Sequence, residues 1–246
     1  MKLFKYTALT IVLGLCIFIV ACKKDTKFYS IITEQKPSND KAQIKVINAA
    51  VGTNRNYVYV DGSAVSGVTF LDGGAFPATN YYADIYTGVH AIMIKDTLAT
   101  GPQTPVTVTA DFKPQGNYTI FMYDSTKSIK AKLVEDKLVV PATVDTGVAM
   151  IRFANFAYST TPIPNLDVFS YSKQTNIFTN VSPTTVSDFI RYRAATTPVD
   201  TLYFRPTGTA VDLVKLGFTL TPRRSYSIVF RGRYSATRTV TVYAQY

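Results

Sequence analysis

The stretch "VTVTADFKPQGNYTIF", residues 106–121, decides the fold. Apolar and polar residues alternate in "VTVTADF", "KPQGN" interrupts the run, and "YTIF" resumes it. Alternation with a period of two is typical of a strand with one buried face, and Pro and Gly between two such runs mark a turn. The stretch therefore predicts two consecutive β-strands joined by a short connection.

The same pattern returns 108 residues later as "VKLGFTLTPRRSYSIV", residues 214–229, where Pro222 matches Pro114 and Tyr226 matches Tyr118. Two more segments repeat in the same order. They pair "IKVIN" with "IRFAN", beginning at Ile44 and Ile151, and "HAIMIK" with "DTLYFR", beginning at His90 and Asp200. Three matches at a nearly constant offset indicate a tandem duplication of a unit of about 100 residues.

Composition indicates that both units are built from strands. The chain holds 17 Tyr and 15 Phe, and no stretch shows sustained helical periodicity. The first unit offers seven short strand candidates: "AQIKVIN", "NYVYVDG", "AVSGVTF", "NYYADIY", "HAIMIK", "VTVTADF" and "NYTIFMY". We therefore predict an all-β protein with two tandem immunoglobulin-like β-sandwich domains, 41–146 and 147–246, joined at "PATVDTG". The chain has no Trp, so neither domain is a true immunoglobulin domain.

The N-terminus resembles an export signal. Lys2 and Lys5 precede an apolar run of 16 residues that ends at Ala21, shorter than the roughly 20 residues of a spanning helix. The run closes with "IVAC", which resembles the lipobox of bacterial lipoproteins. We expect residues 1–21 to be a signal peptide, Cys22 to carry the lipid, and residues 22–40 to be a flexible tether. The alternative is an uncleaved signal anchor.

Charge separates the two units. Residues 41–146 carry nine basic and nine acidic side chains, whereas residues 147–246 carry eleven basic and four acidic ones, a net charge of +7. An exported protein rarely meets nucleic acid, so acidic lipid headgroups or an acidic glycan are the partners that such a surface favours, with a solvated basic face as the alternative. The candidate contacts with an anionic surface form two pairs at opposite ends of one predicted strand: Arg223 and Arg224, and Arg231 and Arg233.

Residues able to carry chemistry are sparse. His90 is the single histidine, at a position that Asp200 takes in the second unit, and we interpret it as a polar residue at a strand entry. Asp72 lacks a second acidic residue at the spacing of a calcium loop. Glu135 and Asp136 lie in a run of alternating charge that is typical of a solvated edge strand. We predict no catalytic set, no cofactor and no metal site.

Exposed aromatics can bind sugars. Tyr81 and Tyr82 are adjacent on one predicted strand, so one of them must face outward, and Tyr123, Tyr158 and Tyr171 fall near strand ends. Ordinary half-buried strand tyrosines are the alternative for each of them.

The chain resembles tandem copies of the bacterial domain of unknown function 4397. The first unit carries that family's whole pattern, in five segments: Ile44–Asn48, Asn56–Gly62, Tyr81–Tyr86, Gly88–His90 and Gly116–Thr119. The second unit is more diverged, with Asn165–Phe169 in place of the second segment, Asp200 at the His position and Arg224 at a Gly position. The resemblance extends over nearly all of residues 42–246. It implies immunoglobulin-like sandwiches in an exported or lipid-anchored protein of a Gram-negative envelope, and it implies no activity.

These observations favour a non-catalytic binding, adhesion or scaffold module. We expect an outer membrane lipoprotein, facing the periplasm or the cell surface, held to the membrane through its N-terminal lipid. Its partner would be an envelope protein or an acidic glycan, and not nucleic acid. The alternative is an accessory glycan-binding protein of a polysaccharide-uptake system, and an enzyme ranks third.

Overall fold

The computed structural model describes residues 39–78, 80–138, 147–194 and 200–245. These residues form strands, turns and loops, and no helix occurs among them. The described ranges accordingly include no helix of the length and hydropathy that crossing a membrane requires. The predicted signal peptide, Cys22 and the tether as far as residue 38 lie outside the described residues, as do residues 141–146 of the predicted joint.

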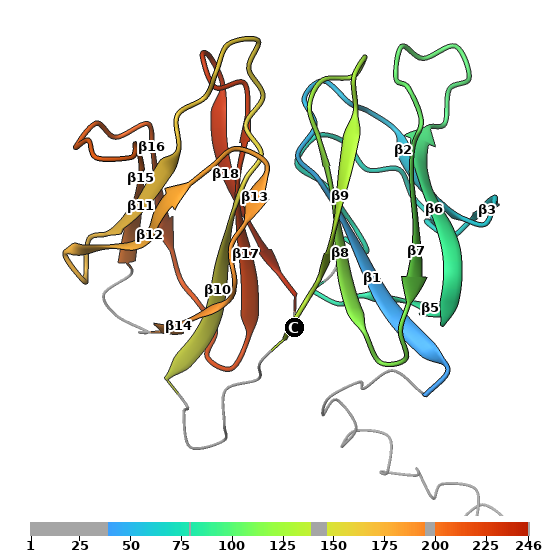
Figure 1. Ribbon diagram of the computed structural model, residues 1–246, viewed down its shortest axis with the longest axis horizontal. Helices are drawn as coiled ribbons and strands as arrows, with labels where there is room; N and C mark the ends of the chain where they lie inside the picture. The colour runs from blue at the N-terminus through green and yellow to red at the C-terminus, as the bar shows by residue number, and fades with distance from the viewer. Residues whose placement is uncertain (1–38, 79, 139–146, 195–199, 246) are drawn as a thin grey trace, which may run out of the picture. The chain divides into compact units, whose positions relative to one another are not determined.

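The first domain is a sandwich of two sheets (Figure 1). One sheet, called here the interface sheet, has the order β4–β1–β8–β9, with β5 also paired to β1. The other, the outer sheet, has the order β3–β2–β6–β7. The strands are β1 (Lys41–Asn48), β2 (Asn56–Val60), β3 (Ser63–Ala64), β4 (Ala75–Phe76), β5 (Ala83–Tyr86), β6 (Gly88–Asp96), β7 (Val106–Phe112), β8 (Asn117–Tyr123) and β9 (Lys130–Glu135).

The second domain repeats this plan strand for strand. Its interface sheet has the order β13–β10–β17–β18, with β14 also paired to β10, and its outer sheet has the order β12–β11–β15–β16. The strands are β10 (Val148–Asn155), β11 (Leu166–Ser170), β12 (Thr175–Val181), β13 (Thr185–Val186), β14 (Ile190–Arg193), β15 (Asp200–Pro206), β16 (Val214–Phe218), β17 (Ser225–Gly232) and β18 (Arg238–Ala244). The predicted all-β class and its two immunoglobulin-like sandwiches are confirmed.

The two repeated tyrosines hold the same corner in each domain. The hydroxyl of Tyr118, in β8, accepts a hydrogen bond from the backbone N–H of Lys113 at 3.0 Å. The hydroxyl of Tyr226, in β17, accepts one from the N–H of Thr221, also at 3.0 Å. A tyrosine that bonds back to the backbone just before its own strand is the tyrosine corner of immunoglobulin-like sandwiches. The sequence repeat is therefore a repeat of structure.

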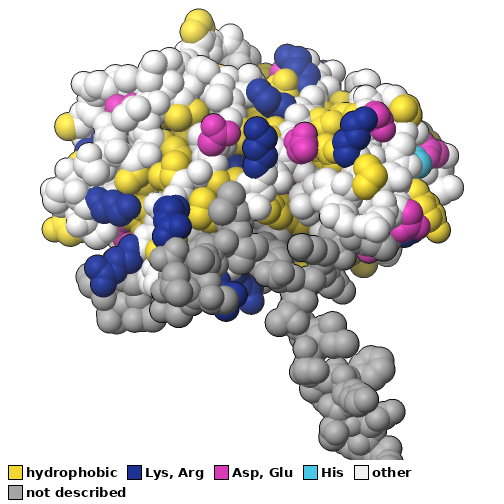
Figure 2. Space-filling view, turned by 60° about the horizontal axis from the view of Figure 1, so that its bottom comes forward, with side chains coloured by type: hydrophobic (Ala, Val, Ile, Leu, Met, Phe, Trp, Pro, Cys, Tyr) yellow, Lys and Arg dark blue, Asp and Glu magenta, His cyan; other side chains and the backbone are white. Residues whose placement is uncertain are grey.

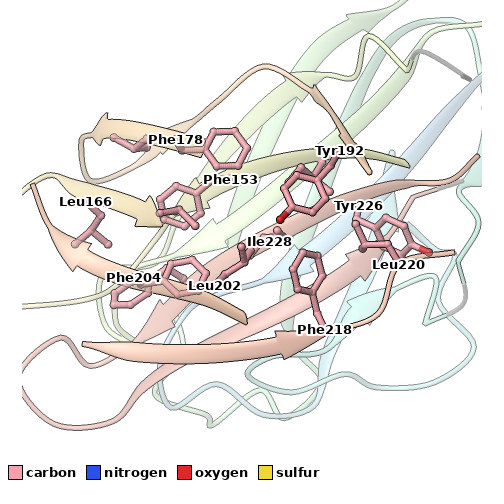
Figure 3. Packing of buried hydrophobic residues seen from close by; sticks show 14 of the residues in the cluster. Phe153, Leu166, Phe178, Tyr192, Leu202, Phe204, Phe218, Leu220, Tyr226 and Ile228 are labelled. Atoms are coloured by element: carbon pink, nitrogen blue, oxygen red, sulfur yellow. The ribbon is translucent and has the colours of Figure 1, made fainter. Parts of the chain in front are cut away.

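Each domain has its own core between its two sheets. In the second domain the aromatic rings of Phe153, Phe204 and Phe230 pack together, with ring centroids 5.5 Å apart for the first pair and 5.9 Å for the second. Figure 3 shows how residues of β10, β11, β15 and β17 converge there. The first domain fills the corresponding space with smaller side chains, among them Val46 and Ile94. All of these side chains are fully buried, so each core holds its two sheets firmly together.

The interface sheets are buried on both faces. In β1 the side chains of Ile44 and Val46 enter the first core, whereas Ile47 faces the other way and is equally buried. It belongs to a third apolar cluster that joins the two domains: Ile47, Ala49, Phe121, Ala154, Phe156, Val229 and Tyr243. Strands with two covered faces lose the contrast between buried and exposed positions, which is why β1 and β10 are buried almost throughout.

Candidate binding surface on the outer sheet of the second domain

The outer face of sheet β12–β11–β15–β16 carries an aromatic cluster. In β15, Leu202 and Phe204 point into the core, so Tyr203 and Arg205 point outward. Strand pairing aligns Phe169 of β11 with Tyr203, and Tyr203 with Lys215 of β16. Tyr171 follows β11 directly and is 61% exposed. We call these five side chains the outer aromatic cluster: Phe169, Tyr171, Tyr203, Arg205 and Lys215.

Rings and cations alternate within the cluster. The ring centroid of Tyr203 lies 6.2 Å from that of Phe169 and 6.3 Å from that of Tyr171. The guanidinium carbon of Arg205 lies 4.4 Å from the Phe169 centroid and 5.1 Å from the Tyr203 centroid. The ammonium of Lys215 lies 5.1 Å from the Tyr203 centroid. Cations within about 6 Å of a ring are attracted by its quadrupole, so both are held in position above the sheet.

One carboxylate lies beside these cations. Asp212 accepts a hydrogen bond from Nε of Arg205 at 2.7 Å and lies 3.4 Å from the ammonium of Lys215. Loss of solvent raises the pKa of Asp212, but the hydrogen bonds and charges of the two cations outweigh this effect and lower the pKa below its ordinary value. The cluster with Asp212 thus has two positive charges against one negative charge.

The first domain shows a reduced version of the same surface. Strand pairing there aligns Tyr59 of β2 with Met93 of β6, and Met93 with Thr107 of β7. The ammonium of Lys95 lies 4.6 Å from the Tyr59 centroid, which repeats the pair of Arg205 and Phe169. Met93 and Thr107 stand where the second domain has Tyr203 and Lys215. One cation–ring pair is therefore common to both domains, and the wider cluster is particular to the second.

A second group of polar residues is buried where the two interface sheets meet. Nη1 of Arg152, in β10, donates a hydrogen bond to Oδ1 of Asp136 at 2.5 Å, and both side chains are at most 2% exposed. Nε of Arg152 donates to the hydroxyl of Ser227 at 2.7 Å. The Gln245 amide donates to the hydroxyl of Thr119 at 2.8 Å. We call these residues the buried polar cluster: Thr119, Asp136, Arg152, Ser227 and Gln245.

Asp136 corrects a prediction from the sequence. Glu135 is exposed, as expected at the end of an edge strand, but Asp136 is buried and bonded. Besides Arg152, its carboxylate accepts hydrogen bonds from the hydroxyl of Thr119 and from that of Tyr82, the latter at 2.6 Å. Burial, and secondarily the negative charge of Asp136, raises the pKa of Tyr82 well above its ordinary value. The prediction holds for Glu135 and for β9 as an edge strand, and it was wrong for Asp136 because the partner cation comes from the other domain.

The four arginines predicted to contact an anionic surface lie at two ends of β17. Arg223 is exposed and Arg224 half-buried just before the strand. At the other end, Arg231 donates from Nη1 to Asp72 of the first domain at 2.7 Å and from Nε to the hydroxyl of Thr241 at 2.8 Å. Arg233 is exposed, 5.7 Å from the ring of Tyr158. Figure 2 shows basic side chains at several separate places on the drawn face, with acidic ones between some of them.

The remaining polar candidates have structural partners. Nδ1 of His90 lies 2.5 Å from a carboxylate oxygen of Asp61. Asp200, which takes the position of His90 in the second domain, accepts a hydrogen bond from Ser170 at 2.6 Å. Tyr81 is 53% exposed, whereas Tyr82 turns inward, so the expectation that one of them faces out is met, although both precede β5. Within the part of the chain that the structure describes, no three His, Cys, Asp or Glu side chains group as metal ligands.

Sequence reasoning named Tyr171 and missed the rest of the outer aromatic cluster. Phe169 and Tyr203 sit at alternate positions of "LDVFS" and "DTLYFRP", and this alternation is a signal for outward-facing side chains. It does not say which strands are neighbours. Arg152 carried a weaker signal: it occupies the middle of a strand, at the position of Lys45 in the matching segment. A cation repeated in the middle of a buried strand requires a partner.

Comparisons with known proteins place the chain in a family and give little more. The profile of DUF4397, a domain of unknown function, matches residues 42–168. The match covers the first domain and ends within β11, so it is shorter than the resemblance inferred from the sequence. None of the curated proteins matches the chain.

One solved structure aligns with most of this chain. It is the crystal structure of CBMbc, of family CBM26, from Eubacterium rectale Amy13K in complex with maltoheptaose. The alignment covers 82% of this chain and 96% of that one, at 9% sequence identity and a TM-score of 0.26. A superposition at this TM-score assigns neither a shared fold nor a ligand.

Proposed function

The chain belongs to the DUF4397 family, and on that premise we propose that it is a lipid-anchored envelope protein acting as a non-catalytic binding, adhesion or scaffold module. The observation that carries the proposal is the pair of outer sheets. Both present a cation held over a ring, Lys95 over Tyr59 and Arg205 over Phe169, on the face directed away from the core of the domain. Aromatic and cationic side chains on a rigid sheet are suited to binding without chemistry.

We further propose that the second domain is a diverged copy of the same family domain. The strand-for-strand correspondence and the duplicated tyrosine corner support this. In the proposed setting the protein is an outer membrane lipoprotein of a Gram-negative bacterium. Arg223, Arg224 and Arg233 are then available to an anionic surface, whereas Arg231 already pairs with Asp72. The second candidate function, an accessory glycan-binding protein, is favoured by the exposed ring of Tyr171.

The anchor is tested by Cys22→Ser in the expressing cell. We expect the variant to accumulate as a larger precursor that no longer incorporates labelled palmitate, while the parent chain is shortened and labelled. Binding is tested by sedimentation of the full chain with purified envelope fragments, since a binding module must stay with them after its lipid anchor is removed by the same substitution. Identical processing and labelling of both chains would contradict the anchor, and loss of all sedimentation would contradict the binding role.

A further inference from the structure

We propose that the outer aromatic cluster of the second domain binds an acidic glycan, a polysaccharide whose sugar rings carry carboxylates. The proposal rests on the proposed binding function and names the partner and the surface. It starts from the row that crosses the sheet. Asn176, Phe169, Tyr203 and Lys215 are paired neighbours on β12, β11, β15 and β16. With strands about 4.8 Å apart, the row is about 14 Å long, the length of a short oligosaccharide segment.

The row offers two kinds of contact at once. The exposed ring of Tyr171 and the half-buried ring of Tyr203 present apolar faces to a sugar ring. Arg205 and Lys215 present positive charge within 5.1 Å of the same Tyr203 ring. A uronic acid unit has the complementary pair of features, an apolar ring face and a carboxylate. A neutral sugar would offer the two cations no carboxylate beyond that of Asp212, which they already share.

Charge in the surrounding domain also favours an anion. Residues 147–246 hold eleven basic and four acidic side chains. Of the acidic ones, Asp200 is buried and bonded to Ser170, and Asp167 is buried on the outward face opposite Arg205, where its carboxylate accepts the N–H groups of Asn180 and Gly208. Asp212 is the carboxylate that pairs with the two cations, and they outnumber it. Rings hold both cations in place, so little side-chain entropy is lost when a carboxylate binds.

The first domain supplies matched substitutions. Tyr203→Met and Lys215→Thr give the second domain the residues that β6 and β7 carry at the same places in the first domain. We would measure binding of a fluorescent oligogalacturonate to the full chain in non-ionic detergent. The double variant should weaken binding at least about tenfold, and Tyr171→Ala by severalfold. The control Lys95→Met, in the first domain, should change binding less than about twofold.

Three competing probes decide the partner. A neutral malto-oligosaccharide of equal length, single-stranded oligothymidylate and phosphatidylglycerol vesicles should each bind more weakly than oligogalacturonate, and none should depend on Tyr203. Equal or tighter binding of any of them through these residues would overturn the proposal in favour of that partner class. Failure of oligogalacturonate to bind, or loss of binding with lowered melting temperature in every variant, would overturn it as well. If the full chain still sediments with envelope fragments, the broader binding function survives that failure.

Discussion

The two domains share their interior and differ on their outer faces. Tyr118 and Tyr226 make the same corner bond, and β1 and β10 pair in parallel with β8 and β17 at the same register. On the outer sheets, by contrast, the first domain has Met93 and Thr107 at the positions where the second domain has Tyr203 and Lys215. Positions that hold the sandwich together are fixed by packing, whereas outward positions are free to change. The difference therefore places the divergence between the two repeats on their outer sheets.

The interface between the domains shows a subtler difference. Equivalent positions of the two repeats face one another there, with Lys45, Thr119 and Asp136 from the first domain and Arg152, Ser227 and Gln245 from the second. Contact between equivalent surfaces is typical of twofold dimers, and here both copies lie on one chain. The two cations are not equal, however. Arg152 bonds directly to Asp136, whereas Lys45 donates to the backbone carbonyl of Tyr81 at 3.2 Å.

The largest effect should come from breaking the buried pair. Arg152→Met leaves the carboxylate of Asp136 buried without its cation, which costs about 3–5 kcal/mol in similar cases. We expect the free energy of unfolding of the full chain to fall by that amount in guanidinium titrations. The double variant Arg152→Met with Asp136→Leu should recover most of the loss, because an apolar pair of similar size is tolerated. A double variant no more stable than the single one would refute the role of the charge.

Lys45 stands in the first domain at the position of Arg152, and its removal should not lower the free energy of unfolding. Burial lowers the pKa of Lys45 to about 8 from its ordinary 10.5, an effect that the negative charge of Asp136 only partly offsets. Between these two pKa values the unfolded chain holds the proton and the folded chain releases it, so stability rises with pH. From pH 8 to pH 9 the free energy of unfolding should increase by on the order of 1 kcal/mol.

Lys45→Met isolates this contribution. The variant should be at least as stable as the parent at pH 7, and its stability should stay flat from pH 8 to pH 9. Above pH 10 both chains should lose stability, because burial raises the pKa of Tyr192 and of Tyr243 to about 12 and their folded forms then hold protons that the unfolded chain releases. A flat profile in the parent chain would show that Lys45 stays solvated.

A smaller, local effect is expected from transferring the cluster to the first domain. Met93→Tyr with Thr107→Lys places two of the three missing side chains beside Tyr59 and Lys95, which already form a cation–ring pair. The chain should then bind two oligogalacturonate molecules where the parent binds one, as measured by calorimetry. Met93→Leu with Thr107→Ser is the matched control and should leave the stoichiometry at one. An unchanged stoichiometry in the grafted chain would mean that the cluster requires more than this row.

Sequence alone predicted the repeated strands well and the loops between them poorly. The predicted ranges of β7 and β8 agree with the structure, because both alternate and are bounded by turn residues. "AVSGVTF" was predicted as one strand, but the strand ends at Ala64 and the chain pairs again with β2 only at Phe70, in a bridge with Asn56. There the hydroxyl of Ser66 accepts the N–H of Val58 at 2.9 Å and takes the place of a backbone partner, and Val68 is 69% exposed. A side chain that substitutes for a ladder bond is invisible in a hydrophobicity pattern.

Neither surface could be assembled from the sequence because each depends on pairing between distant segments. The outer aromatic cluster joins side chains of β11, β15 and β16, and the buried pair joins Asp136 to Arg152 across the domain boundary. Strand alternation gives the direction of each side chain but not the neighbour that it meets. The repeat nevertheless carried part of the answer, since Lys45 and Arg152 stand at matching positions in the middle of strands whose apolar neighbours are buried.

The smallest effect concerns the backbone that both domains share. Gln115 and Arg223 stand at matching places before β8 and β17, with φ of 59° and 63°, a left-handed conformation that costs an ordinary residue about 1–2 kcal/mol. Their N–H groups donate to Lys41 and Val148 at 2.7 and 2.6 Å, so the same turn is closed in both domains.

Gln115→Gly and Arg223→Gly should each remove this strain. Glycine also gains freedom in the unfolded chain, which offsets about 0.5–1 kcal/mol of the gain. We therefore expect each variant to raise the free energy of unfolding by less than about 1 kcal/mol, and by equal amounts within error. Gln115→Ala and Arg223→Ala keep the Cβ atom and should show no increase in the free energy of unfolding.

Arg223 is also a candidate contact for an anionic surface, and its glycine variant separates the two roles. Stability should rise as it does for Gln115→Gly, whereas any loss of vesicle binding should appear in the Arg223 variant alone. Unequal stability changes would mean that the turns, alike in their backbone, are held by different side-chain interactions.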